Sequence, residues 1–185
     1  NPPFWYKQTV NLYPATRSLV DKENRSPFRC LSNLRCPEMI SEKEALRKLL
    51  NIYAKCPLFS KLHIWVRFKS CPFLELIKHI PEDGKILDLG CGYGLFACLL
   101  HLTSAGRNIT GIDPDRKKLG IAIKVTTNCS EKISFRMGDI CEIGENDLDC
   151  ITIIDVLYLI PFERWDLIFE NCFNRLKPNG LLLIK

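Results

Sequence analysis

The sequence lacks several patterns that would assign it to a specialised class of protein. No apolar stretch approaches the roughly 20 residues of a membrane-spanning helix, so we expect no membrane span. No charged start followed by an apolar stretch marks a secretion signal in these residues, which begin at Asn1 rather than Met. No repeat or low-complexity segment is visible. With 46% hydrophobic and 25% charged residues, the chain is expected to fold as an ordinary globular protein.

Closely spaced cysteines are also missing, although the chain holds ten cysteines. There is no C-x-x-C pair, the spacing that zinc sites and redox motifs favour because neighbouring thiolates must converge on one ion or partner. Several cysteines lie within apolar runs, where a free thiol acts as a small hydrophobe. We therefore expect reduced, structural cysteines, no metal site and a cytoplasmic protein.

Acidic residues are scarce in the first part of the chain. Residues 1–80 hold 14 Lys/Arg against 6 Asp/Glu, a net charge of +8, whereas residues 81–185 hold 12 against 15, a net charge of −3. A basic N-terminal part beside a mildly acidic core is expected to attract RNA, an anionic membrane or an acidic small molecule. A solvated helical surface explains the same charge equally well.

The chain divides near residue 81. Residues 1–35 combine prolines with scattered aromatics, so we predict mostly irregular structure there. From Ser41, which forms a capping box with Glu44, apolar periodicity predicts three short helices, the second opening at Pro57 and the third at Pro72. The apolar face of the second helix comprises Leu58, Leu62, Trp65 and Val66.

Residues 81–185 alternate between apolar strands and helices, which predicts an α/β fold with a parallel sheet covered on both faces. Strands are predicted at 85–89, 108–113, 133–137, 148–154 and 181–184, with helices at 95–102, 115–126 and 162–176. We therefore distinguish residues 1–80, an irregular and helical extension, from residues 81–185, the ligand-binding core.

The first predicted strand ends in the glycine-rich turn Asp88-Leu89-Gly90-Cys91-Gly92-Tyr93-Gly94. Ligands of an open parallel sheet bind at the carboxyl ends of its strands. Glycines let the backbone turn sharply and approach a ligand closely. The dinucleotide fingerprint G-x-G-x-x-G would need glycine at position 95, where the chain has leucine, so the spacing disfavours a nicotinamide-binding domain.

Residues 86–94 closely resemble the first motif of the class I S-adenosylmethionine (SAM)-dependent methyltransferases, an apolar strand followed by D-x-G-x-G-x-G. The resemblance covers about residues 81–185. It implies a Rossmann-like, doubly wound and mostly parallel sheet of at least five strands, with SAM as cofactor and S-adenosylhomocysteine as product. The cofactor-binding residues that it implies are Asp88, Gly90, Cys91, Gly92, Gly94, Asp113, Pro114, Asp139, Ile140 and Asp155.

The resemblance also implies roles for individual strand ends. Asp113 would bind both ribose hydroxyls, while Asp139 would accept from the adenine amino group and Ile140 would pack on the ring. Taken singly, each aspartate is equally well explained as a helix cap, and Asp113 precedes Pro114, a residue that suits a helix start. The ordered set of matches, including the glycines, favours the cofactor site.

The fourth predicted strand ends at Asp155 and Tyr158, where the family lines the methyl-transfer site, so these are the candidate catalytic residues. His63 and His101 are weaker candidates because both lie in amphipathic helices. Helices at 41–80 occupy the place where the family often builds a substrate lid. We predict that the basic and aromatic cluster there faces the substrate, namely Trp65, Arg67, Phe68 and Phe73.

Two further features concern the ends of the sequence. Residues 1–4 spell NPPF, a motif that adenine-N6 and glutamine-amide methyltransferases place after the fourth strand. That place is already filled by the segment from Asp155, so we interpret the match as coincidence. The family's sheet usually continues with another helix and two more strands, which are missing here. Either the chain is a fragment or the sheet ends early. A fifth strand left exposed would be an unprotected edge, prone to pairing with another chain, so we favour a fragment.

The sequence does not identify the methyl acceptor. The leading hypothesis is an enzyme that methylates a small-molecule or lipid-like acceptor, because no nucleic-acid-binding module is recognisable. The alternatives are an RNA or protein methyltransferase that uses the basic N-terminal region, and a non-catalytic scaffold that keeps the fold.

Overall fold

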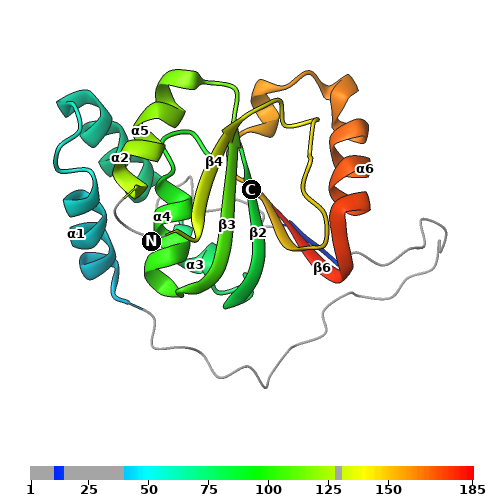
Figure 1. Ribbon diagram of the computed structural model, residues 1–185, viewed down its shortest axis with the longest axis horizontal. Coiled ribbons are helices and arrows are strands. Elements are labelled where there is room, and N and C mark those ends of the chain that lie inside the picture. Colours follow the sequence, from blue (N-terminus) through cyan, green and yellow to red (C-terminus); the bar gives the residue numbers. More distant parts are fainter. Residues whose placement is uncertain (1–10, 15–39, 128–130) are drawn as a thin grey trace, which may run out of the picture.

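A six-stranded sheet forms the centre of the computed structural model, which describes residues 11–14, 40–127 and 131–185 (Figure 1). The strand order is β1-β6-β5-β2-β3-β4. The strands are β1 (Asn11–Pro14), β2 (Asp83–Leu89), β3 (Gly106–Asp113), β4 (Ile133–Met137), β5 (Leu148–Ile153) and β6 (Leu176–Ile184). Strands β2 to β6 run parallel to one another, so the predicted α/β fold with a mostly parallel sheet is confirmed.

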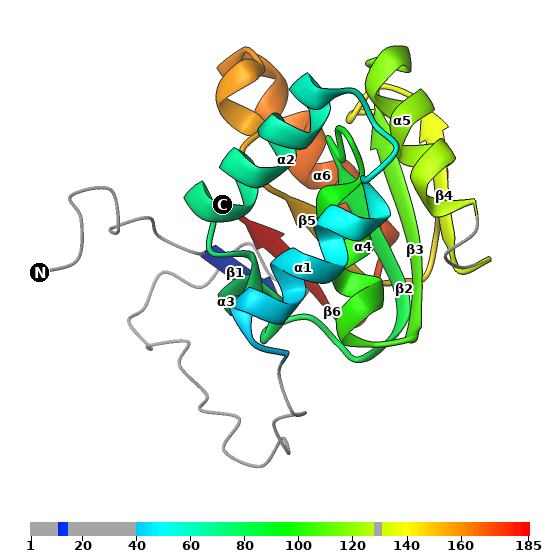
Figure 2. The same cartoon turned by 90° about the vertical axis from the view of Figure 1, so that its left-hand side faces the viewer.

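Helices cover both faces of the sheet. One apolar cluster joins one face to α1 (Glu42–Ile52), α2 (Leu58–Ser70), α3 (Phe73–Ile77), α4 (Leu95–Thr103) and α5 (Arg116–Thr126). A second cluster joins the other face to α6 (Trp165–Arg175). Alternation along β2 explains this arrangement, since Ile86 belongs to the first cluster and its neighbour Leu87 to the second. Figure 2 shows α1 and α2 outside α4, on the side turned toward the viewer.

The start of α1 follows the sequence prediction only in part. Ser41 caps the helix by accepting a hydrogen bond from the backbone N–H of Glu44 at 3.2 Å. The reciprocal half of the capping box is not formed, because the Glu44 carboxylate lies 2.9 Å from Lys48 one turn further on. A charge pair at this spacing competes for the carboxylate that would otherwise reach back to the cap.

Residues 177–180, which separate the last predicted helix from the last predicted strand, lie inside β6. The prediction began that strand at residue 181, whereas β6 begins at Leu176. A shift in register between β5 and β6 absorbs the intervening residues, and Asn179 takes a left-handed conformation with φ of 66°. The proline and glycine there thus mark an irregularity within a strand.

The outer edge of β6 is paired, so the last parallel strand is not left as an unprotected edge. Strand β1 runs antiparallel to β6, with Asn11 opposite Ile184 and Pro14 opposite Leu181. The prediction of mostly irregular structure for residues 1–35 missed this strand, because four residues that end in proline carry little strand signal. The NPPF motif at residues 1–4 lies outside the described residues.

The cysteines within apolar runs are small hydrophobes, as the sequence predicted. Cys98, Cys150 and Cys172 are buried in the two apolar clusters, and none of the three is in a disulfide. Burial raises the pKa of the Cys172 thiol to about 12, which keeps this side chain neutral. These positions contribute packing rather than reactivity.

A buried arginine fastens the start of β3 to the segment before β2. Arg107 is only 2% exposed, and its guanidinium donates to the carbonyls of Pro81, Leu100 and Ile80 and to the Thr103 hydroxyl. We expect Arg107→Met to lower the free energy of unfolding by about 3 kcal/mol, because it leaves these acceptors unsatisfied. Urea denaturation measures this, with Arg116→Met at an exposed position as the control. Equal stability of the two variants would contradict the expectation.

Candidate active site

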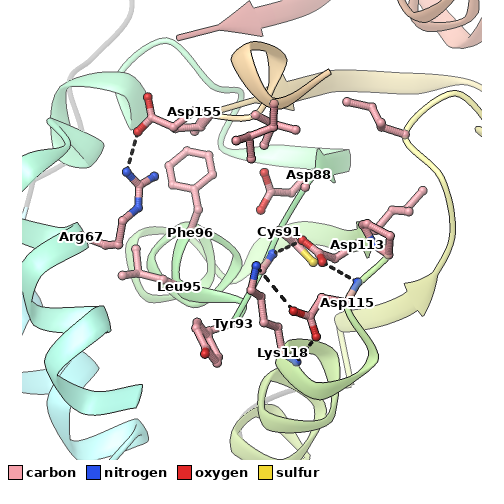
Figure 3. A pocket seen from close by; sticks show the side chains of 18 of the residues that line it. Arg67, Asp88, Cys91, Tyr93, Leu95, Phe96, Asp113, Asp115, Lys118 and Asp155 are labelled. Atoms are coloured by element: carbon pink, nitrogen blue, oxygen red, sulfur yellow. Dashed lines mark hydrogen bonds and ion pairs between the residues drawn. The ribbon is translucent and has the colours of Figure 1, made fainter. Parts of the chain in front are cut away.

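A cavity of about 430 Å³ opens at the carboxyl ends of β2, β3 and β5 (Figure 3). Helix α2 and the segment after β5 complete its walls. The predicted residues that line it are Asp88, Gly90, Cys91, Gly92, Asp113, Pro114, Ile140, Asp155 and Tyr158. The topology thus places side chains from distant parts of the sequence around one space, as expected for the strand ends of a parallel sheet.

The glycine-rich turn needs glycine for two different reasons. Gly90 has a φ of 76°, and a Cβ atom there would collide with the side chain of Val156. Gly92 also has a positive φ, of 55°, but a Cβ atom there would meet nothing within 4 Å. Gly90 therefore permits close packing of the turn against the segment after β5, while Gly92 leaves backbone open to the cavity.

Asp113 at the end of β3 holds the glycine turn in place. Its buried carboxylate accepts hydrogen bonds from the backbone N–H groups of Gly92 and Asp115, each at 2.8 Å. One oxygen takes each bond, so each oxygen keeps a further lone pair for a ligand. A carboxylate fixed in this way is suited to accept two hydrogen bonds from a cis-diol.

Asp88 brings a second buried carboxylate to the same cavity. One of its oxygens accepts from the Thr152 hydroxyl at 2.8 Å. Burial raises the pKa of Asp88 to about 7, and the negative charge of Asp113 acts in the same direction, while the Thr152 hydrogen bond opposes them. Two buried carboxylates in one cavity favour a ligand that carries positive charge.

Asp155 joins α2 to the end of the sheet through two ion pairs. Its carboxylate lies 2.6 Å from Arg67 of α2 and 2.7 Å from Lys185, which follows β6 (Figure 3 shows the Arg67 pair). Burial alone would raise the pKa of Asp155, but the hydrogen bonds from Lys185 and Arg67 outweigh it and lower the pKa. The carboxylate is therefore held in its charged form and connects two walls of the cavity.

Two predicted cofactor residues do not line the cavity. At Gly94, which precedes α4 with a φ of 78°, a Cβ atom would lie 2.7 Å from the Phe135 ring, so this glycine permits close packing. The Asp139 carboxylate accepts from the Cys141 backbone N–H and from Arg164, each at 2.9 Å. Its neighbour Ile140 does face the cavity.

The cluster predicted to face the substrate is divided. Arg67 and Phe73 line the cavity, with the guanidinium 5.8 Å from the centre of the Phe73 ring. Phe68 is buried in the core and Trp65 is half exposed, and neither lines the cavity.

The two histidines also differ in their positions. His63 lines the cavity with its ring 5.0 Å from Tyr93, and burial lowers its pKa, with the charges of Arg67 and Lys118 adding to the effect. His101 lies away from the cavity.

Some wall residues were not foreseen from the sequence. Ile64, Phe96 and Lys118 also line the cavity. Lys118 follows Asp115 by three residues at the start of α5, a spacing that places both on one side of that helix, so it could have been found from the pattern. Among the described residues no group of three or more His, Cys, Asp or Glu could hold a metal ion.

Comparison with known proteins assigns the fold and the glycine turn to one family. The sequence model of a methyltransferase domain matches residues 86–180, just over half of the chain. The chain belongs to the class I SAM-dependent methyltransferases. SAM is the cofactor of this family. The cavity fits it, because SAM carries both a cationic sulfonium and a ribose cis-diol where the chain offers two buried carboxylates.

Individual relatives in this methyltransferase family are similar over only part of their length. The ubiquinone biosynthesis O-methyltransferase of Rickettsia bellii is 32% identical over 103 residues, which cover 56% of this chain and 42% of that enzyme. The phosphoethanolamine N-methyltransferase of Plasmodium falciparum is 32% identical over 107 residues, which cover 57% and 40%. This chain thus spans about two fifths of the enzymes that it matches.

A solved structure supports the fold independently. The PH0226 protein from Pyrococcus horikoshii superposes with a TM-score of 0.56 at 22% identity, covering 76% of this chain and 64% of that one. At this identity the likeness is evidence for the fold alone. The acceptor of this methyltransferase has to be argued from its own residues.

Proposed function

We propose that this chain binds SAM and transfers its methyl group to a small-molecule or lipid-like acceptor. The arrangement of Asp113 carries the proposal, because one buried carboxylate both fixes the glycine turn and keeps lone pairs for a diol. SAM supplies a methyl group on a sulfonium centre with a good leaving group. The chain's own task is to align the two reactants and to exclude water.

We assign the acceptor side of the cavity to Asp155 and Tyr158. Asp155 is a poor proton acceptor because its pKa is lowered by two cations, so we give it a positioning role. Tyr158 lines the cavity while remaining largely exposed, which places it at the mouth, where an acceptor enters. Helices α1 to α3 form the proposed substrate lid, with Arg67 as their link to Asp155.

A calorimetric titration with SAM and with S-adenosylhomocysteine tests the proposal. We expect binding of both in the micromolar range and no fluorescence response on titration with NADH. A folded chain that binds neither compound would contradict the proposal and favour the alternative of a non-catalytic scaffold. A melting curve shows whether the chain is folded.

The lid assignment predicts a loss of turnover in Arg67→Met. This change removes the ion pair to Asp155 and the charge beside Phe73, so we expect turnover of an identified acceptor to fall by about tenfold or more. Arg47→Met, at an exposed position of α1, is the matched control. Equal turnover in both variants would remove Arg67 from the site.

An RNA or protein acceptor is the alternative, since residues 1–80 are strongly basic. Exposed leucine, phenylalanine and tryptophan accompany the lysines of α2, which suits an apolar acceptor better than a phosphate backbone. RNA binding with a steep dependence on salt would reverse this preference. We place the enzyme in the cytoplasm because no disulfide joins the cysteines that the structure describes.

A further inference from the structure

One face of α2 is apolar and exposed to solvent. The exposed fraction is 79% at Leu58 and 75% at Phe59, and it stays near one half along the rest of the face. This α2 apolar face consists of Leu58, Phe59, Leu62, Trp65 and Val66. At helical spacing the five side chains fall within one arc of about 120°, so they form a continuous stripe.

The opposite side of α2 is the one that packs against the rest of the protein, which leaves the stripe exposed to solvent. Ser60, Ile64 and Phe68 are the buried residues of α2 and pack toward the core. The sequence prediction identified the apolar stripe but not its environment, since a stripe of this kind normally faces a protein core. In Figure 2, α2 lies on the outer side of the molecule, nearer to the viewer than α4.

The charge of α2 is of one sign. The helix contains Lys61, Arg67 and Lys69 and no acidic residue, and Lys55 lies just before it. Lys61 falls beside the apolar stripe and Lys69 follows its C-terminal end, where Lys69 forms an ion pair with Glu42 of α1. A stripe of Leu, Phe and Trp bordered by lysine is the composition of helices that lie in the headgroup region of anionic bilayers.

The stripe and the cavity lie on different sides of α2. Helix α2 lines the cavity through His63, Ile64 and Arg67, which at helical spacing lie about 100° to 160° around the helix from the centre of the stripe. Further exposed apolar side chains follow β5, where Tyr158 and Leu159 are 73% and 70% exposed and line the same cavity. Exposed apolar side chains therefore also occur at the mouth of the cavity, separately from the stripe.

We propose that the α2 apolar face docks this chain on the surface of an anionic lipid bilayer. Attachment of this kind is peripheral, and among the described residues no helix is long and apolar enough to cross a membrane. The proposal rests on exposure and charge, and it stands independently of methyl transfer. It adds a lipid surface as a binding partner of the basic helix α2.

Vesicle flotation tests the docking. The full chain is mixed with vesicles of phosphatidylcholine alone or with about 30% phosphatidylglycerol, at low salt and at high salt. We expect the chain to float with the anionic vesicles only, and to bind about tenfold less at high salt, because the lysines contribute through screened charge. The emission of the protein's tryptophans should shift to the blue on binding, and Trp65→Phe should remove most of the shift.

Paired substitutions separate the stripe from exposed apolar residues in general. We expect Leu58→Ser with Phe59→Ser to weaken vesicle binding by about tenfold or more, since two apolar side chains lose their contact with lipid. The matched control is Ile123→Ser with Leu167→Ser, which changes side chains 48% and 49% exposed on α5 and α6. Neither Leu58 nor Phe59 lines the cavity, so SAM binding measured by calorimetry should be unchanged in the double variant.

Three results would overturn the proposal. The first is equal flotation with neutral and anionic vesicles, or none with either. The second is an oligomer of the original chain in solution that the double variant Leu58→Ser, Phe59→Ser does not form. That result would make the stripe an interface between copies of the chain. The third is salt-sensitive binding to RNA without binding to vesicles. Failure of SAM binding alone would affect the proposed function and leave the docking result intact.

Discussion

Asp113→Asn is expected to weaken SAM binding by about 100-fold, which corresponds to about 2.7 kcal/mol. Both carboxylate oxygens accept backbone N–H groups, from Gly92 and from Asp115. An asparagine must direct its NH₂ group at one of these donors, so one hydrogen bond becomes a repulsive contact. The variant therefore loses the charge, the diol partner and one attachment of the glycine turn at once.

Isothermal calorimetry with SAM measures the loss, and Asp166→Asn on an exposed part of α6 is the control for removal of a carboxylate. The change also costs stability, so binding has to be measured well below the melting temperature of the variant. If Asp113→Asn bound SAM within about threefold of the original chain, Asp113 would be a structural anchor only.

The second large effect concerns pH and the buried carboxylate of Asp88. Its pKa in the folded chain is about 7, mainly because burial disfavours the charged form, whereas an unfolded aspartate titrates near 4. Between these values the folded state holds a proton that the unfolded state has lost. The contribution of Asp88 to the free energy of unfolding should thus be highest below pH 4. It should fall by about 4 kcal/mol as the pH rises to 7.

Urea denaturation across this range, with and without Asp88→Asn, isolates the contribution. We expect the variant to be more stable than the original chain at pH 8, because an amide is not penalised by burial as a charge is. Parallel stability curves for the two proteins would show that Asp88 does not titrate in this window.

Asp88 also couples protons to cofactor binding. SAM is cationic at its sulfonium, so it should favour the charged form of Asp88 and displace its proton. We expect the affinity for SAM to rise between pH 6 and pH 8, and calorimetry in buffers of different ionisation enthalpy to detect proton release. In Asp88→Asn the affinity should be lower and independent of pH in this range.

The sequence predicted the core of the fold well because its signals are local. The strand ending at Leu89 and the glycine turn follow from a short apolar run and from glycines that adopt positive φ angles, and both are in the structure. The placement of Asp88 and Asp113 beside one cavity follows from the rule that parallel strands end at one edge.

Features that depend on distant partners escaped prediction. The ion pair between Arg67 and Asp155 joins residues 88 positions apart, and no local sequence pattern predicts it. The hydrogen bond from Arg164 to Asp139 likewise decides where that carboxylate points. Apolar periodicity found the stripe of α2 but could not distinguish a face that meets the core from one that meets solvent, since both show the same spacing.

The pairing of β1 with β6 has a consequence for the order in which the chain folds. It joins Asn11 to Ile184, so it closes nearly the whole chain into a loop, and the entropy of such a closure delays contact formation. The parallel strands have much nearer partners and are expected to assemble first. During synthesis, β6 would then emerge with its outer edge unpaired until β1 returns, and this interval is when the nascent chain is most exposed to pairing with a neighbour.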